Sequence, residues 1–319
     1  MKLVINPHVC MIVLLSIQLI SCLQKSKMEP EKAALGPNKG QANKNKKTTG
    51  TPNKNQPPNS ESKTCLEWSA AKMTGGVLIP EASGLAVSED RSKLFHIDDS
   101  GNPAYIHVTA NDGKKLNDVD LTNAKNIDWE ALASGPCPLE RSRCLYVADI
   151  GDNRKKRSAY QIYIVQESAL SQPQANSHTL QFTYDDGKSH NAEGAAMSPQ
   201  GDLFIFTKES STRVYRVSKK DLSKPQTVAS YMGSLPSDTA TGADIDSTGQ
   251  HLVILDYVKA TEYQIDLGDI KSFENPRFTH LPLSIQRQQE AIAYRSNTEI
   301  IYTSEQEQNK IGIVTCTKK

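Results

Sequence analysis

The fold is decided by the stretch EGAAMSPQGDLFIFTK, residues Glu193 to Lys208, and by its counterpart SGLAVSEDRSKLFHID, residues Ser83 to Asp98. In each, a polar turn joins a short run of small and apolar residues to an apolar strand, which is the pattern of a β-hairpin. Three further segments with this pattern begin at Glu130, Thr241 and Glu290. The five starts are about 50 residues apart, and a period of this size is typical of repeat folds.

The strand pattern predicts an all-β protein. Further alternating strands lie between the repeats, and no long helical periodicity is present. Four short strands per repeat of about 50 residues are typical of a β-propeller. We expect one propeller over residues 65–319, with five blades favoured by the repeats and six also compatible with the length. The last repeat stops after three strands, so the segment 65–73 should supply the fourth and close the ring.

The N-terminal segment has the features of an export signal. Lys2 precedes an apolar run from Val9 to Ile20, which is shorter than the roughly 20 residues that span a bilayer and typical of a signal peptide. We therefore assign residues 1–21 to a signal peptide. The sequence LISC, ending at Cys22, resembles the bacterial lipobox, and this resemblance implies cleavage before Cys22 and its lipidation. A secretory signal with an incidental cysteine is the alternative.

Residues 22–64 have the composition of a disordered tether. They are rich in Asn, Pro and Lys, with nine lysines against three glutamates after Cys22, and they hold too little apolar surface to form a core. The resemblance to lipoproteins implies a cell-envelope protein attached to a membrane through the lipid on Cys22, either periplasmic or surface-exposed. Leu23 and Gln24 replace the aspartate that retains many lipoproteins in the inner membrane, which favours the outer membrane.

Charge and composition exclude two classes of protein. The net charge is +1, and because the positive charge is concentrated in the tether, the folding part is mildly acidic. An acidic domain argues against binding to nucleic acid. With 37% hydrophobic residues and no long apolar segment, a polytopic membrane protein is also excluded. We expect a monomer.

Four cysteines remain after the signal peptide and Cys22: Cys65, Cys137, Cys144 and Cys316. An even number in an exported domain predicts disulfides, for which three pairings are possible. Cys137 and Cys144 flank the short loop CPLERSRC, so we expect them to pair locally. Ring closure would bring Cys65 to Cys316. A zinc site is the alternative, but no CxxC motif or histidine at ligand spacing accompanies these cysteines.

The repeats also predict an acidic rim, because a hairpin brings the start of its first strand and the end of its second to the same edge. Of the ten such positions, seven are acidic: Glu130, Glu193, Glu290, Asp98, Asp149, Asp256 and Glu305. Carboxylates this close repel one another unless a cation lies among them, and oxygen ligands suit Ca²⁺ before Mg²⁺. We expect a calcium site centred on the three glutamates. The alternative is that the acids cap turns or pair with Lys208, Arg154, Arg157 or Arg287.

Several motifs resemble a largely uncharacterised group of bacterial secreted β-propeller proteins. The resemblance covers about residues 80–305 and rests on the segments HIDDSGNP, NIDWEALASGP, LYVADIGDNRKKR, NAEGAAMS and QQEAIAY. It implies a propeller with a rim formed by Asp128, Glu130, Asp149, Asp152 and Asn153, and it implies no reaction. Asp98 and Asn102 depart from the pattern of the group. More distantly, the architecture looks like calcium-dependent propeller hydrolases such as apyrase-like nucleotidases, lactonases and phytase-like enzymes.

Two functions follow, and the sequence leaves open whether the protein is an enzyme. The first is a tethered binding protein whose rim holds an unknown protein, glycan or small molecule; a surface adhesin is one form of it. The second is a calcium-dependent hydrolase of phosphoesters, nucleotides, lactones or esters, with His96 and His190 as candidate catalytic residues. Residues 154–157 (RKKR) are a candidate anion-binding loop. GxSxG, P-loop and HExxH motifs are absent. We favour binding because no general base is identifiable.

We predict that Cys22→Ala moves the protein from the detergent phase to the aqueous phase, because its membrane attachment depends on acyl chains at this residue. Detergent-phase partitioning of cell extracts measures this. Cys10→Ala, within the predicted signal peptide, is the control and should partition like the wild type. If Cys22→Ala is processed normally and still partitions into detergent, the lipobox interpretation is wrong.

Overall fold

The computed structural model describes residues 65–318, apart from positions 78, 80, 285 and 306–308. The predicted signal peptide, Cys22 and the tether lie outside the described residues, so the predictions about them stay predictions. The described residues are mainly β-strand, with one α-helix, α1 (Lys271–Glu274), and two 3₁₀ turns. No helix among them has the length and apolar character needed to cross a membrane.

The strands form four-stranded antiparallel units that follow one another along the chain. The first contains β3 (Ala82–Val87), β4 (Lys93–Asp98), β5 (Tyr105–Ala110) and β6 (Lys115–Leu121), with the short β10 (Gln174–Ala175) beside β6. The second contains β7 (Trp129–Pro136), β8 (Arg143–Asp149), β9 (Tyr160–Gln166) and β11 (His178–Tyr184). The third contains β12 (Ala192–Met197), β13 (Leu203–Thr207), β14 (Thr212–Val217) and β15 (Gln226–Leu235). The fourth contains β16 (Gly242–Ile245), β17 (His251–Leu255), β18 (Ala260–Gln264) and β19 (Arg277–Leu281).

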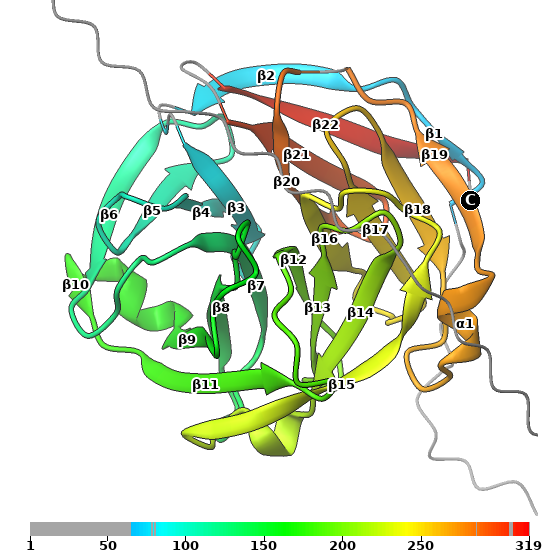
Figure 1. The fold of residues 1–319 in the computed structure, drawn as a ribbon. Helices are drawn as coiled ribbons and strands as arrows, with labels where there is room; N and C mark the ends of the chain where they lie inside the picture. Colours follow the sequence, from blue (N-terminus) through cyan, green and yellow to red (C-terminus); the bar gives the residue numbers. More distant parts are fainter. Residues whose placement is uncertain (1–64, 78, 80, 285, 306–308, 319) are drawn as a thin grey trace, which may run out of the picture. The chain divides into compact units, whose positions relative to one another are not determined.

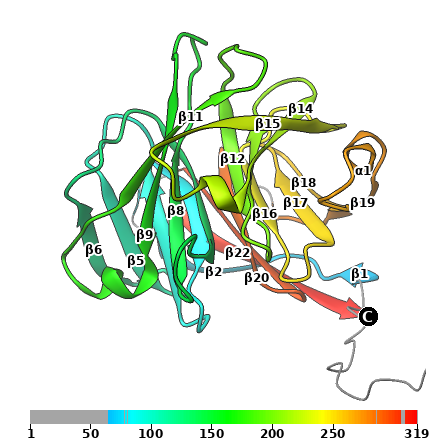
Figure 2. The same ribbon diagram turned by 90° about the horizontal axis from the view of Figure 1, so that it is seen from below.

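The last unit combines the two ends of the domain. It contains β20 (Gln289–Ser296), β21 (Glu299–Ser304) and β22 (Asn309–Lys318), and β22 pairs with both β1 (Glu67–Trp68) and β2 (Lys72–Val77). Figures 1 and 2 show β1 and β2 beside β22. The prediction that an N-terminal strand closes the ring is therefore confirmed, and the closing segment extends to Val77.

The first strand of each unit lies at the centre. The inner strands β3, β7, β12, β16 and β20 contact one another in this order, and β20 contacts β3 (Figure 1). Sheets that radiate from a ring of inner strands form a β-propeller, so the all-β propeller prediction is confirmed. The described residues contain five inner strands but four separate sheets, because β11 and β15 pair in parallel and join the second and third units.

The apolar core lies between neighbouring units. Along β8, Cys144, Tyr146 and Ala148 face the third unit, whereas Leu145 and Val147 face the first. This alternation follows from the two-residue period of a strand that is buried on both faces. Each of the five contacts between neighbouring units has its own buried apolar cluster among the described residues. Closure of the ring therefore adds the cluster between the last and first units to the four that consecutive units form.

Small residues of the repeats occupy the inner strands, where the backbones crowd together. All six residues of β12, AEGAAM, are buried. A Cβ atom on Gly84 in β3 would lie 2.8 Å from the backbone nitrogen of Leu132 in β7, closer than packed atoms come. The small-residue run that marks each repeat is thus a steric requirement of the ring.

Two disulfides join the cysteines as expected. Cys65 bonds to Cys316 at the ring closure, with their Cα atoms 5.7 Å apart. Cys137 bonds to Cys144 across the loop between β7 and β8. Trp68 in β1 packs in the cluster between the fourth and last units, and its Nε1 donates to Glu262 at 3.1 Å. The pairing prediction is confirmed, and the zinc alternative is excluded.

We predict that removing the terminal disulfide lowers the free energy of unfolding more than removing the local one. The disulfides span 251 and 7 residues, for which the chain-entropy model gives roughly 5 and 2.5 kcal/mol. Guanidinium unfolding of the pairs Cys65→Ser/Cys316→Ser and Cys137→Ser/Cys144→Ser measures both losses. A larger loss of unfolding free energy for the Cys137–Cys144 pair would contradict the prediction that Cys65–Cys316 contributes more to stability.

Candidate functional site

Four inner strands carry a β-bulge near their first residue. The pairing register shifts across Ser83, Glu130, Glu193 and Glu290, and a bulge changes the direction in which a side chain points. The four residues line one cavity of about 10 Å³ between the inner strands, which is room for about one water molecule. The structure thus brings together the three glutamates that the repeat register placed in equivalent positions.

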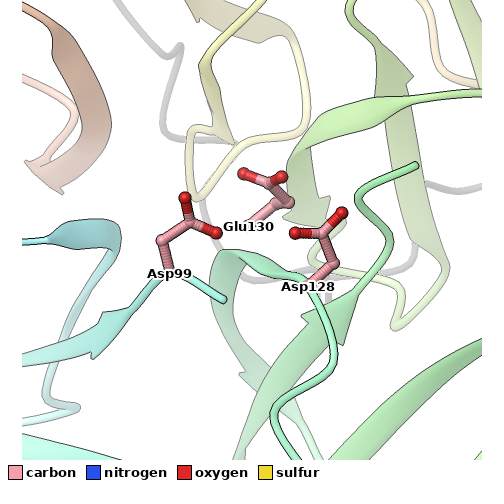
Figure 3. Close-up of side chains that lie close together, drawn as sticks. All are labelled: Asp99, Asp128 and Glu130. Carbon is pink, nitrogen blue, oxygen red and sulfur yellow. The ribbon is translucent and has the colours of Figure 1, made fainter. Parts of the chain in front are cut away.

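Three carboxylates form a compact cluster at this end of the inner strands, and we call it the carboxylate trio: Asp99, Asp128 and Glu130. One oxygen from each lies within 4.8 Å of the other two, and Figure 3 shows the three side chains pointing toward one another. Asp99 follows β4, Asp128 precedes β7 and Glu130 lies in the bulge of β7. Glu130 is 7% exposed, and the described residues offer its carboxylate no hydrogen-bond donor.

The trio is electrostatically unfavourable when all three carboxylates are charged and no cation is bound. Burial raises the pKa of Glu130 well above its usual value, and the charges of Glu193, Asp99 and Asp128 raise it further. Burial is also the main reason why the pKa values of Asp99 and Asp128 are raised. These groups must therefore either hold protons or share a positive charge.

Gly151 allows the backbone to approach two members of the trio. A Cβ atom at this position would lie 2.3 Å from Glu130 Oε1 and 2.4 Å from Asp128 Oδ2. A larger residue at the glycine of the DIGDN segment would therefore have to displace these two carboxylates. Asp152, the next residue, holds the following loop because its side chain accepts the N–H groups of Lys156 and Arg157 at 2.9 and 2.7 Å.

Lys208 neutralises a different part of the rim. Its Nζ lies 2.7 Å from Glu193 Oε1 and hydrogen-bonds the hydroxyl of Tyr257. For Glu193, the alternative of pairing with Lys208 therefore holds. Glu290 lines the same small cavity without an ion pair among the described residues. Burial first, and the charge of Glu193 second, raise its pKa to about 8.

Besides Glu193 and Glu290, four more of the seven expected ligands lie outside the carboxylate trio. Asp98 Oδ2 lies 2.7 Å from His107 Nε2. Asp149 pairs with Arg157 at 2.6 Å, and Asp256 caps its own turn by accepting the N–H groups of residues 258 and 259. Glu305, the seventh, accepts a hydrogen bond from Gln288 at 2.7 Å. Each of these carboxylates is therefore stabilised locally.

Asp99 is the member of the trio that sequence reasoning missed. The repeat offset selected Asp98, the last residue of β4, whereas the next residue is the one that reaches the trio. Both aspartates stand in the motif HIDDSGNP, so the motif was the available signal. Asp128, expected at the rim only from the resemblance, lies in the trio.

The candidate catalytic histidines have surroundings that do not support catalysis. His96 is fully buried, its Nε2 lies 3.1 Å from the Thr109 hydroxyl, and burial lowers its pKa to about 3. His190 is held between Asp186 and Glu209 at 3.0 and 3.2 Å. Both imidazoles are thus part of the packed structure.

The candidate anion-binding loop is partly neutralised. Arg157 pairs with Asp149, and Lys155 pairs with Glu209 at 2.6 Å. Arg154 and Lys156 are exposed. The loop therefore retains less free positive charge than its sequence suggests.

Comparisons with known proteins identify no family: no family model and no curated protein matches the sequence. Similar solved structures include the PQQ-bound aldose sugar dehydrogenase of Streptomyces coelicolor, with 9% identity over 78% of this chain and 98% of that one and a TM-score of 0.46. The WD40 repeats of RRP9 match with 9% identity over 78% and 99% and a TM-score of 0.41. The chain spans 56% of a Kuenenia stuttgartiensis hydrazine synthase chain, with 16% identity over 71% of its own length and a TM-score of 0.40. The fold assignment rests on the strand topology.

We predict that the stability of the cation-free protein falls as pH rises from about 5 to 8. Between the usual pKa of 4.5 and about 8, folded Glu290 holds a proton that the unfolded chain releases, so stability is lost as pH rises through the folded pKa. Thermal unfolding in chelator measures this. Glu290→Gln should give a shallower fall because glutamine does not titrate, whereas the exposed Glu274→Gln should match the wild type. Equal slopes in all three would contradict the raised pKa.

Proposed function

We propose that the protein is a lipid-anchored cell-envelope propeller that binds Ca²⁺ at the carboxylate trio and holds a ligand or partner at this rim. One observation carries the calcium proposal: carboxylate oxygens of Asp99, Asp128 and Glu130 converge within 4.8 Å, and none of the three forms an ion pair among the described residues. Burial first, and the neighbouring carboxylates second, raise the pKa of Glu130, and a bound cation would offset both effects by favouring the charged carboxylates.

The spacing of the oxygens suits calcium. Ca²⁺ binds oxygen ligands at about 2.4 Å, so two ligands on opposite sides of the ion are roughly 4.8 Å apart. Three carboxylate oxygens separated by no more than this distance can therefore share one ion. Mg²⁺ requires a shorter and more regular octahedral shell, which makes it the less suitable cation.

The cation would leave room for a ligand. Calcium takes six to eight oxygen ligands, so carboxylates contributed by three residues leave positions for waters or for oxygens of a bound molecule. Glycans, acidic proteins and small anions all offer such oxygens. Adhesion to another surface through the same positions is a form of this binding role.

The open positions also support the second candidate, a calcium-dependent hydrolase of phosphoesters, nucleotides, lactones or esters. A metal-bound water can act as a nucleophile. Binding is favoured because the two candidate catalytic residues are held by local partners, His96 by Thr109 and His190 by Asp186 and Glu209. The envelope location is supported by the apolar N-terminal run and by the lipobox-like LISC ending at Cys22.

We predict that calcium raises Tm and that EDTA reverses the increase. At a hundredfold excess over Kd, a ligand that binds only the folded state stabilises it by about 2.7 kcal/mol. Calorimetry of purified protein measures the response. Asp99→Asn should blunt it, whereas Asp98→Asn, the same change one residue earlier, should leave the calcium-induced shift unchanged relative to its own chelated state. The proposal fails if the wild type melts at the same temperature with and without calcium.

Gly151→Ala offers an independent test because it keeps all three carboxylates. Its methyl group would intrude between Asp128 and Glu130 and displace their carboxylates. We therefore expect calcium affinity to fall by about tenfold or more, which corresponds to a loss of about 1.4 kcal/mol or more in binding free energy. Calcium titration by calorimetry measures this. Gly268→Ala, at an exposed position without a positive φ where the added Cβ would meet only Asp266 Oδ1 at 3.4 Å, is the control for the loss of a glycine.

The two candidate functions are separated by turnover. Nucleoside triphosphates, phosphomonoesters, lactones and simple esters are offered to the wild type and to Glu130→Gln in the presence of calcium. Hydrolysis by the wild type that is lost in Glu130→Gln would establish the hydrolase. Calcium binding without turnover of any of these substrates would leave binding as the function.

A further inference from the structure

A second cavity lies at the opposite end of the inner strands. The residues near the starts of these strands line the small cavity beneath the acidic rim, whereas the residues at their ends line a cavity of about 310 Å³. Leu85 and Leu132 line both cavities. The two spaces therefore follow one axis, with the leucines between them, and we refer to the larger space as the axial cavity.

The axial cavity is polar and is lined by charged groups of both signs. Its three acidic residues are Glu89, Asp244 and Asp246, of which Asp246 pairs with His251 at 3.2 Å. Its lining includes three arginines, Arg91, Arg143 and Arg295, together with five serines and Asn297. Arg295 is neutralised by Glu299 at 2.5 Å. The other two arginines have no ion-pair partner among the described residues. A volume near the lower end of the range for ligand pockets suits a molecule of monosaccharide size.

Arg143 is the best-defined group in this cavity. It begins β8, and its Nη2 donates to the hydroxyl of Ser134 at 2.8 Å. Its Nε is buried and has no hydrogen-bond acceptor within the described part of the chain. A buried donor without a partner is costly, and a guanidinium is shaped to bind a carboxylate or phosphate through two parallel hydrogen bonds.

Asp244 provides a second polar group from another strand. Its carboxylate accepts the backbone N–H groups of Tyr294 and Ile245 at 2.8 and 2.9 Å, and it forms no ion pair among the described residues. Burial raises its pKa to about 7, so it carries a proton in part of the molecules at neutral pH. Its repulsion of a bound anion is reduced accordingly, and it can hydrogen-bond a hydroxyl group.

We propose that the axial cavity binds a small hydroxylated oxyanion, with Arg143 holding the carboxylate or phosphate group and Asp244 and the serines holding hydroxyl groups. Sugar acids and sugar phosphates have this chemistry. This site is separate from the carboxylate trio, and the proposal does not depend on calcium binding. The proposal gives a binding role to Arg143 and Asp244, which take no part in the proposed calcium site.

The test titrates the full-length protein, with chelator present, by calorimetry with three probes: glucuronate, glucose 6-phosphate and glucose. We expect at least one of the two oxyanions to bind. Glucose should bind at least about tenfold more weakly, or not at all, because it lacks the group that accepts charged hydrogen bonds from arginine. Binding of glucuronate alone identifies a carboxylate site, and binding of glucose 6-phosphate alone identifies a phosphate site.

Variants assign the binding to the cavity. Arg143→Gln should abolish it, and Arg143→Lys should weaken it, because lysine keeps the charge and loses the planar pair of donors. Arg141→Gln is the matched control: Arg141 is exposed, two residues away and outside the axial cavity, so affinity should be unchanged.

If Arg143→Gln does not fold, Ser134→Ala provides a second test. It removes the hydroxyl that accepts a hydrogen bond from Arg143 and should therefore still alter affinity. Absence of binding by both oxyanions, glucose binding of equal strength, or equal affinities in the wild type and both Arg143 variants would overturn the proposal.

Discussion

The close approach of the inner strands around the axis is the constraint on which the rest of the structure depends. Where Gly84 of β3 meets the backbone of β7, no Cβ atom fits, and β12 is likewise built from small buried residues. Among the described residues, two cavities lie along the inner strands, one near the starts of the strands and one near their ends. At one end the bulges turn Glu130, Glu193 and Glu290 into a cavity of about 10 Å³, and at the other end the strands diverge around Arg143.

Each end of the axis contains charged groups that form no ion pair among the described residues: carboxylates at the acidic rim and the guanidinium of Arg143 at the other end. At the acidic rim, Lys208 meets Glu193, while the carboxylate trio and Glu290 respond to burial by raised pKa values. Protons and a cation therefore compete for the rim, because both relieve the same repulsion. At the opposite end, the guanidinium of Arg143 forms no ion pair among the described residues, and an anion can bind to it. A protein with both features can bind two chemically different ligands along one axis.

Features set by local pattern were predictable from the sequence. Repeat length and strand alternation indicated a propeller, and the incomplete last repeat indicated that β1 and β2 would pair with β22. The same closure explained why Cys65 bonds to Cys316. Within the site, the shared position of Glu130, Glu193 and Glu290 in the repeat was also predictable, because equivalent strands begin at the same edge. The repeat offset selected Asp98, which lies 2.7 Å from His107, whereas the next residue, Asp99, is the one that lies in the trio.

The sequence by itself determined the fold class, the ring closure, the disulfides and an acidic rim. Each of these follows from the spacing of residues along the chain, and spacing records which strand and which face a residue occupies. Only the tertiary structure decided that the three carboxylates of the trio converge. It also decided that Lys208 forms an ion pair with Glu193, and that Arg143 and Asp244 line one cavity. These contacts join loops and strands of different units, and the distance between such groups depends on the bulges, turns and side-chain directions that the folded ring imposes.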